Sequence, residues 1–246
     1  MVNRLKKVYC QSLRDVHKRG KPGVSVIIPA HNAEKFLAKV IESVQHQQRD
    51  FPLEIIVVDD GSTDGTADKA QSLGVTLIQQ VKQGAAAARN HGITHSSYGY
   101  LFFLDADDLL CPDSLQRLWK ALHQTPNLVA VFSRAQDFVE LGIPNAQRYL
   151  AGARKEPYSG CLPGCALIRK EAFRRVGLFD ATLKSGETIA WQLKLKDSGL
   201  PVASVEDVTL SRRIHGSNTG ISFANQEKHD YANILRARLK ARQGGG

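Results

Sequence analysis

The chain has 246 residues, of which 42% are apolar and 23% charged, so a packed core is expected and general disorder is not. At roughly 150 residues per domain, this length predicts one large domain, with or without a short appendage. No apolar run reaches the roughly 18 residues that a membrane-spanning helix needs, and Met1 leads into no apolar signal region. The four cysteines are too few for a disulfide scaffold and predict reduced thiols in a cytoplasmic protein.

The net charge of +9 is concentrated at the two ends of the chain. Residues 1–23 contain seven Lys or Arg and one Asp, and residues 228–246 contain five Lys or Arg and one Asp. The nearly neutral body disfavours a nucleic-acid-binding function, which normally needs a basic stripe on the folded surface. Each basic end is predicted to form an amphipathic helix. Such a helix can lie on an anionic membrane, or it can dock on the domain and leave a solvated basic face.

The body alternates predicted strands and helices. Strands are expected at residues 24–28, 54–58, 75–78, 100–104 and 128–132, each short and rich in apolar residues. Helices are expected after Asn32, which is a suitable cap, and then up to Leu73, at 84–93 and at 112–123. Residues 135–165 are rich in Gly and Pro and predict a loop. Helices from Lys170 and over 187–198 follow, and then a strand near 202–205.

This order predicts an α/β fold, with an open, mostly parallel sheet flanked by helices in a single domain. Ligands of such sheets bind beyond the carboxyl ends of the strands. Three polar segments arrive there, namely Pro29-Ala30-His31-Asn32, Asp59 to Asp64, and Asp105-Ala106-Asp107-Asp108. We therefore expect residues 24–134 to bind a ligand and residues 135–220 to cover the other side of the cleft. Residues 1–23 and 221–246 are expected to be basic helical extensions.

The acidic cluster of Asp105, Asp107 and Asp108 follows a fully apolar strand. Carboxylates this close repel one another unless a cation lies between them, and a hard divalent cation that also binds a diphosphate would serve. The alternative is a solvated loop that caps the helix near Pro112. The turn of Asp59, Asp60 and Ser62 can bind a base or a ribose, or it can be ordinary turn chemistry. Neither a G-x-x-x-x-G-K-[ST] loop nor a G-x-G-x-x-G turn after the first strand is present, which disfavours NTPases and dinucleotide dehydrogenases.

Together with Gly84 to Asn90, these segments resemble the family-2 glycosyltransferases with the GT-A fold, which is Rossmann-like. The four motifs occur in the family's order and spacing, and a weaker resemblance continues to about residue 220. The resemblance implies an inverting, hexosyltransferase-type enzyme that transfers a sugar from a nucleotide-diphosphate donor, with UDP the commonest nucleotide, and uses Mg²⁺ or Mn²⁺. The acceptor, whether a glycan, a lipid-linked molecule or a peptide, is not implied.

Carried over residue by residue, the resemblance implies a donor site of Pro29, Ala30, Asn32, Glu34, Asp59, Asp60, Ser62, Arg89, Asp105 and Ala106. Within it, Asp60 lies at the base and Arg89 near the ribose and phosphate. Asp107 is the implied metal ligand. His215, in the segment Arg212 to Asn218, is a second candidate ligand, and its alternative is a surface histidine in a Gly/Ser loop.

Inversion needs a base that deprotonates the acceptor hydroxyl. The family often supplies an Asp in a Gly-Glu-Asp-x-Asp segment, but this chain has Thr188 and Ala190 at those positions, which leaves Glu187 as the candidate catalytic base. The alternative for Glu187 is a first-turn carboxylate that favours the helix dipole. Trp191 is expected to pack rather than to stack on the acceptor.

The function predicted is a cytoplasmic metal-dependent glycosyltransferase. Peripheral contact at the inner membrane face through its basic ends stays open as the alternative to docking of these ends on the domain. The alternative is a non-catalytic nucleotide-sugar-binding or scaffold protein with a degraded base motif, which Thr188 and Ala190 favour. A nucleic-acid-binding module is a third hypothesis. Cys161 and Cys165 lack a second ligand pair at zinc spacing and are interpreted as structural.

Overall fold

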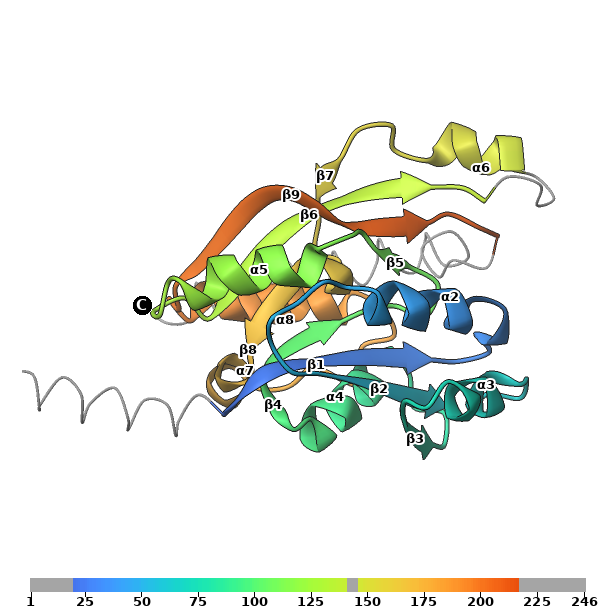
Figure 1. Ribbon diagram of the computed structural model, residues 1–246, viewed down its shortest axis with the longest axis horizontal. Coiled ribbons are helices and arrows are strands. Elements are labelled where there is room, and N and C mark those ends of the chain that lie inside the picture. The colour runs from blue at the N-terminus through green and yellow to red at the C-terminus, as the bar shows by residue number, and fades with distance from the viewer. Residues whose placement is uncertain (1–19, 141–145, 217–246) are drawn as a thin grey trace, which may run out of the picture.

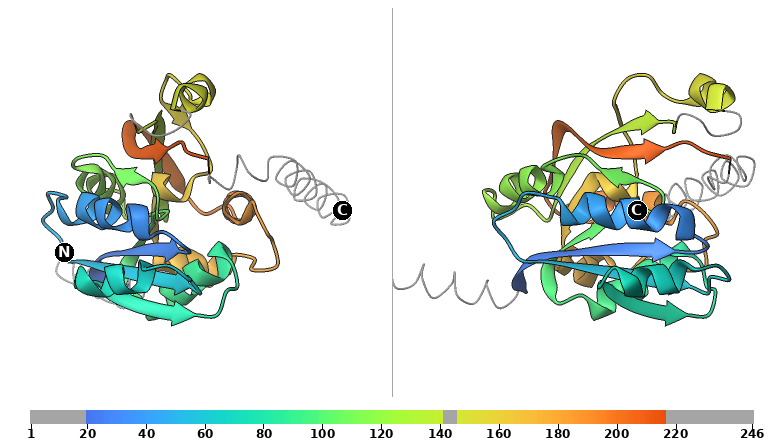
Figure 2. Two further views of the ribbon diagram at one scale, coloured as in Figure 1. Left: turned by 90° about the vertical axis from the view of Figure 1, so that its right-hand side faces the viewer. Right: turned by 45° about the vertical axis from the view of Figure 1, so that its right-hand side comes forward.

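A computed structural model describes residues 20–140 and 146–216. Within these residues one curved sheet of nine strands has helices on both faces (Figures 1 and 2). The strands are β1 (Lys21–Ala30), β2 (Leu53–Asp60), β3 (Thr76–Gln80), β4 (Tyr98–Phe103), β5 (Leu109–Leu110), β6 (Ala130–Phe138), β7 (Tyr158–Ser159), β8 (Ala166–Arg169) and β9 (Val202–Arg213). The helices are α2 (Glu34–Gln45), α3 (Thr66–Ser72), α4 (Ala85–His95), α5 (Ser114–His123), α6 (Ala146–Gly152), α7 (Lys170–Val176) and α8 (Glu187–Asp197), with a 3₁₀ turn, η1, at Pro163–Cys165.

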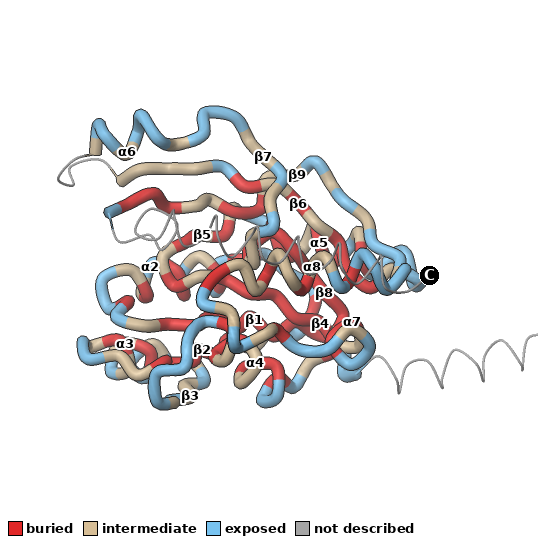
Figure 3. The backbone as a smooth tube through the Cα atoms, turned by 180° about the vertical axis from the view of Figure 1, so that it is seen from behind, coloured by how far each residue is buried: buried red, intermediate tan, exposed pale blue. Residues whose placement is uncertain are grey.

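The first half of the sheet is parallel, as predicted. β1 pairs with β2 and with β4, and β2 pairs with β3. Alternate residues of β1 enter two separate cores: Val26 and Ile28 pack with α2 and α5, whereas Ile27 packs with α4, α7 and α8. Both faces are covered, which is why β1 is apolar over consecutive residues instead of alternating. Figure 3 shows this buried centre in red, whereas α6 is coloured as half-buried or exposed throughout.

Beyond β4 the sheet contains antiparallel pairs, in agreement with the prediction of a mostly parallel sheet. The four-residue strand β8 was not predicted, and it lies between β4 and β6, antiparallel to both. β6 extends to Phe138, and α6 and β7 also lie within the segment expected to be a loop. β9 has 12 residues, whereas the sequence predicted four. The prediction was too short because polar residues interrupt the strand and leave no apolar run. The predicted fold class is confirmed, since the sheet is mixed and its first four long strands, β1 to β4, pair in parallel.

The direction of β9 brings the C-terminal motif to the predicted ligand edge. β8 is antiparallel to β4 and to β6, and β9 is parallel to β6, so β9 runs in the same direction as β4. The carboxyl ends of β1, β2, β4 and β9 therefore lie at one edge of the sheet. Arg212 and Arg213, the last residues of β9, therefore lie at the same edge of the sheet as the acidic cluster that follows β4.

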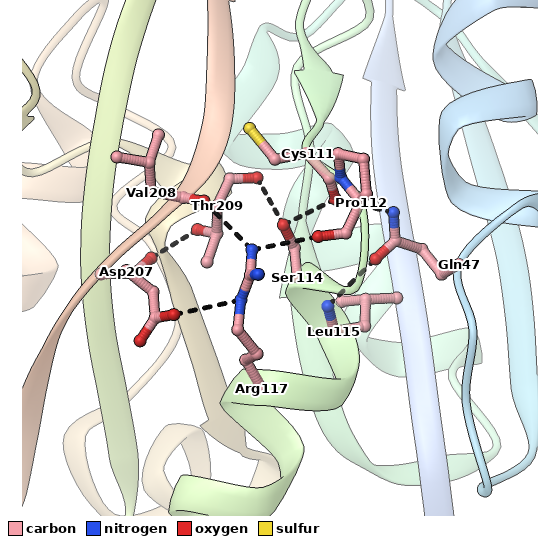
Figure 4. Close-up of polar contacts among 10 residues, drawn as sticks. Gln47, Cys111, Pro112, Ser114, Leu115, Arg117, Asp207, Val208 and Thr209 are labelled. Atoms are coloured by element: carbon pink, nitrogen blue, oxygen red, sulfur yellow. Dashed lines mark hydrogen bonds and ion pairs between the residues drawn. The ribbon is translucent and has the colours of Figure 1, made fainter.

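Three polar side chains link the end of α2 to the start of α5, and α5 to β9 (Figure 4). Gln47 Nε2 donates to the carbonyl of Cys111 at 2.9 Å, and Gln47 Oε1 accepts from the first turn of α5. Ser114 Oγ donates to the carbonyls of Cys111 and Thr209 at 2.7 and 3.0 Å. Arg117 donates to the carbonyl of Val208 on β9 and lies 3.2 Å from Asp207. These bonds pair the backbone groups at the junction, where α5 begins beside the long strand.

Asn32 does not cap α2, contrary to the prediction. The helix begins at Glu34 with Ala33 as its N-cap, and Asn32 has a φ of +52°. Asn32 Oδ1 instead accepts a hydrogen bond from the amide of Thr63 at 2.8 Å, and the Asn32 amide donates to Ser62 Oγ at 2.9 Å. The side chain therefore joins the loop after β1 to the loop after β2.

The close approach of α4 to β1 depends on Gly92. A Cβ atom at this position would lie 2.4 Å from Ile27 Cγ2, and Ile27 is fully buried in β1. We expect Gly92→Ala to lower the free energy of unfolding by about 1–3 kcal/mol, because a β-branched core side chain has no room to move. Urea denaturation measures the loss. Gly152→Ala is the matched control, since a Cβ at this helical glycine meets no atom within 4 Å and should leave stability unchanged or raised. Equal effects of the two substitutions would contradict the prediction.

Within residues 20–140 and 146–216 no helix is long and apolar enough to cross a membrane. The predicted basic helical ends lie outside the described residues, apart from Gly20 and from Lys21 to Gly23, which belong to β1.

Candidate active site

A cavity of about 550 Å³ opens at the carboxyl ends of the parallel strands. The loop after β1, the acidic loop after β4, the start of α8 and the end of β9 form its walls, and α4 contributes Arg89. Eight of the residues proposed from the sequence line this cavity: Pro29, Asn32, Arg89, Asp105, Ala106, Asp107, Glu187 and His215. The fold therefore brings together residues that are separated by more than half of the chain.

Five predicted donor-site residues do not line the cavity: Ala30, Glu34, Asp59, Asp60 and Ser62. Glu34, Asp59, Asp60 and Ser62 bond to backbone amides of the neighbouring loops instead, and Ala30 is buried at the end of β1. Asp60 is buried, and its carboxylate accepts bonds from the amides of Gln83 and Gly84, at 2.7 and 2.8 Å, and from Gln80 Nε2. The predicted contact of Asp60 with the base stays a prediction.

Asp59, also buried, accepts from the Ser62 amide at 3.0 Å. Glu34 accepts from the Gly65 amide at 3.0 Å, and Ala30 is buried at the end of β1. These contacts hold the loops after β1 and β2 in place.

Asp107 and His215 form the centre of the acidic wall. His215 Nε2 lies 2.9 Å from Asp107 Oδ2, although the two residues are 108 positions apart. His215 is 8% exposed, so the alternative of a surface histidine is wrong for this fold. Asp108 is buried as well, and its Oδ1 accepts a bond from the Arg213 amide at 2.9 Å.

The carboxylates of the acidic loop are held in an unfavourable electrostatic environment. Burial raises the pKa of Asp105, against the attraction of Arg89, and the charge of Asp107 raises it further. Burial also raises the pKa of Asp108 well above its ordinary value, with Asp107 and Asp105 adding to the effect. Clustered negative charge of this kind is relieved by a cation bound among the carboxylates.

The donor set fits a divalent metal only if the substrate completes it. Asp107 and His215 offer an oxygen and a nitrogen ligand side by side, but among the described residues no group of three His, Cys, Asp or Glu could hold a metal ion. Mg²⁺ in enzymes is commonly bound by one or two side chains together with substrate phosphates and water. The pair fits that arrangement, with the remaining positions left for phosphate oxygens.

Arg89 connects the acidic loop to α8. Its guanidinium, 4% exposed, donates through Nη2 to Asp105 Oδ1 at 2.7 Å and through Nη1 to Glu187 Oε1. Burial by itself lowers the pKa of Arg89, but Asp105 and Glu187 raise it overall, so the guanidinium stays charged. The planar guanidinium thereby holds both carboxylates in a fixed geometry.

The start of α8 positions Glu187 at the cavity. Gly186, the N-cap, has a φ of +76°, a conformation that glycine adopts without strain. Trp191 packs as predicted: it is 2% exposed, stacks on Phe173 at 4.2 Å, and donates from Nε1 to the carbonyl of Gly177. This packing fixes the helix, so Glu187 and the buried Thr188 face the cavity.

Other cavity residues were not proposed from the sequence, notably His31, Lys184 and Arg212. His31 Nε2 lies 2.8 Å from Lys82 Nζ, which joins the loops after β1 and β3. The position of His31 inside the first motif was a signal that could have identified it.

Cys161 and Cys165, both interpreted as structural from the sequence, differ in their surroundings. Cys161 is exposed at the cavity, and burial raises the pKa of Cys165 to about 12, which keeps that thiol protonated.

The acidic loop, the carboxylate-bound Arg89 and His215 lie together at the carboxyl edge of a parallel sheet, which is where α/β folds of the GT-A architecture bind their ligands. The comparison with known families agrees: residues 25–177 match Glycosyl transferase family 2. The chain therefore belongs to Glycosyl transferase family 2.

Similar proteins support the same family and fold. Chondroitin synthase of Escherichia coli is 26% identical over 228 residues, covering 89% of this chain and 33% of the synthase. The structure of residues 1–349 of S. aureus TarS with UDP has a TM-score of 0.66 at 19% identity, covering 87% of this chain and 63% of that TarS chain. The mannosyltransferase PcManGT of Pyrobaculum calidifontis, with GDP-Man and Mn²⁺, has a TM-score of 0.66 at 21% identity, covering 89% and 66%. This chain thus spans about a third of the chondroitin synthase and about two thirds of the TarS 1–349 chain and of the PcManGT chain.

Proposed function

We propose that this glycosyltransferase transfers a hexose from a UDP-sugar to an acceptor hydroxyl with inversion, assisted by Mg²⁺ or Mn²⁺. The observation that carries this proposal is the Asp107–His215 pair beside the Arg89-bound carboxylates in a single cavity. The UDP complex of TarS and the Mn²⁺ complex of PcManGT support the nucleotide and metal classes by analogy. Residues 24–134 would form the donor half and residues 135–220 the acceptor half.

In this proposal Asp107 and His215 would hold the metal, and the donor diphosphate would complete its ligands. A metal bound there would supply positive charge to neutralise the leaving diphosphate. Pro29, Asn32 and Ala106 would border the nucleotide. Asp105 would orient the ribose or the sugar, and Arg89, which donates to Asp105, would hold this carboxylate in place. Asp59, Asp60 and Ser62 would recognise the base or order the loops around it.

Glu187 is the proposed base. One carboxylate oxygen, Oε1, is bound by Arg89, which aims the group, and among the described residues Oε2 has no hydrogen-bond partner. We expect Glu187→Gln to reduce kcat by roughly a hundredfold to ten-thousandfold, the range of general-base catalysis, while the donor affinity changes little. Single-turnover transfer assays and donor titrations measure the two effects separately. Full transfer by this variant would remove Glu187 from the role.

A thermal-shift screen of nucleotide sugars tests donor binding. A ligand that binds only the folded state raises Tm by mass action, so one donor should raise Tm with Mn²⁺ and less so with EDTA. The shift should disappear in Asp107→Ala. A well-folded protein that responds to no donor would contradict the proposed activity.

The second candidate function is nucleotide-sugar binding without turnover. Thr188 is buried at the cavity where the family often has Asp, and Glu187 is paired with Arg89. The residues present therefore support a catalytic base less well than they support a metal site. Donor binding without donor hydrolysis or transfer to any acceptor would favour this candidate.

A further inference from the structure

Arg213 is a buried cation that touches the acidic loop but has no place in the proposed chemistry. Its side chain is 2% exposed, and its Nε donates to the backbone carbonyl of Asp107 at 2.8 Å. Its own backbone amide donates to Asp108 Oδ1 at 2.9 Å. One residue at the end of β9 therefore holds two residues of the loop that follows β4.

The guanidinium is fixed on its other sides by three further groups. Its central carbon lies 5.0 Å from the ring centre of Phe36 and 4.7 Å from that of Phe138. Nη1 lies 2.9 Å from Glu140 Oε2, and Glu140 also pairs with Lys39 of α2 at 2.5 Å. Arg213 thus joins α2, the end of β6 and the acidic loop through a planar group that cannot rotate freely.

These contacts of Arg213 lie directly beside the proposed metal ligands. The bond of Arg213 to the Asp107 carbonyl fixes the backbone of one ligand, and His215, the other, is two residues further along the chain. The His215 ring packs on the Phe36 ring at 4.8 Å, the same ring that contacts Arg213. Burying a guanidinium is costly, and such groups do not in general increase stability over apolar side chains. A positioning role explains a buried arginine at this point of the fold.

We propose that Arg213 is a positioning residue that sets the separation of Asp107 and His215 and thereby the affinity of this pair for a divalent cation. The proposal rests on the proposed function, because it concerns the same metal ligands. Arg213 touches neither substrate nor metal in this role. It acts through the backbone of Asp107 and through the path of the chain from β9 to His215.

Mn²⁺ binding in the presence of UDP tests the proposal, measured by the EPR signal of free Mn²⁺. We expect Arg213→Met to weaken Mn²⁺ binding by about ten- to a hundredfold, as loss of groups that orient metal ligands typically does, and Arg213→Lys to recover part of the loss. Arg117→Met is the matched control, since Arg117 also donates to backbone carbonyls and pairs with a carboxylate but lies at the α5–β9 junction. It should retain the native Mn²⁺ affinity.

A metal-free readout separates this proposal from the proposed function. The ¹⁵N resonances of the His215 imidazole, assigned with His215→Gln, should shift in Arg213→Met and not in Arg117→Met. If the native chain bound no Mn²⁺ with any nucleotide, the proposed metal-assisted function would fail, and an unshifted His215 resonance would overturn the positioning role as well. Native Mn²⁺ affinity in Arg213→Met overturns the positioning role alone. Should Arg213→Met not fold, Glu140→Gln removes the ion pair at a partly exposed side chain and should weaken Mn²⁺ binding severalfold.

Discussion

Asp107→Asn is expected to reduce kcat/KM for sugar transfer about a thousandfold or more. This corresponds to about 4 kcal/mol of transition-state stabilisation, the scale of charge neutralisation by a catalytic metal ion. The reason is that Asp107 is the carboxylate in direct contact with His215, and the two offer the oxygen–nitrogen pair for a divalent cation. Initial rates over a Mn²⁺ titration measure the effect, and excess EDTA should reduce the native enzyme to a similar rate.

The matched control for Asp107→Asn is Asp68→Asn, which makes the same chemical change at an exposed position in the first turn of α3. It should leave the rate and its Mn²⁺ dependence unchanged. If Asp107→Asn kept native activity that EDTA does not inhibit, the metal-assisted mechanism would have to be abandoned.

Arg89→Met is expected to lower the free energy of unfolding by about 3–5 kcal/mol. Removing one partner from a buried ion pair leaves the other charge uncompensated, and here two carboxylates, Asp105 and Glu187, lose the same partner. The Glu187 side chain is 13% exposed and that of Asp105 is 36% exposed, so water compensates Asp105 better than Glu187. Urea unfolding followed by circular dichroism measures the loss.

Arg134→Met is the comparison for Arg89→Met. Arg134 pairs with Glu206, whose side chain is 89% exposed, and exposed pairs of this kind contribute about 0–1 kcal/mol. The double variant Arg89→Met with Glu187→Gln should recover part of the stability lost in Arg89→Met, because it removes one of the two unpaired charges. An Arg89→Met protein as stable as the Arg134→Met protein would show that the buried network does not stabilise the fold.

The first half of the fold, up to β4, was predictable because its signals are local. The strand at Val24 to Ile28 is apolar on both faces, which is typical of a central parallel strand, and β1 lies there. The motif residues after β1, β2 and β4 had to meet at one edge, because the carboxyl ends of parallel strands coincide. The family resemblance rests on these same segments, and the family match over residues 25–177 covers them.

The second half was less predictable because its elements depend on pairing. β8 has four residues, too few to show a period, and it is a strand because it fills the space between β4 and β6. The polar residues of β9 give no apolar run, yet pairing with β6 extends it to Arg213. Asn32 has the chemistry of a helix cap, but it bonds to the neighbouring loop instead.

By itself the sequence determined the α/β class and the motifs after β1, β2 and β4, and it identified Asp107, Glu187 and His215 as candidate site residues. Each of these was recognised from a short contiguous stretch of residues. Only the tertiary structure decided how these residues act on one another. Three contacts depend on the direction in which β9 and α8 return to the sheet: His215 with Asp107, Arg89 with Glu187, and Arg213 with the backbone of the acidic loop. Contacts across 98 to 108 positions of chain follow from strand pairing and helix packing, and no local pattern of residues encodes them.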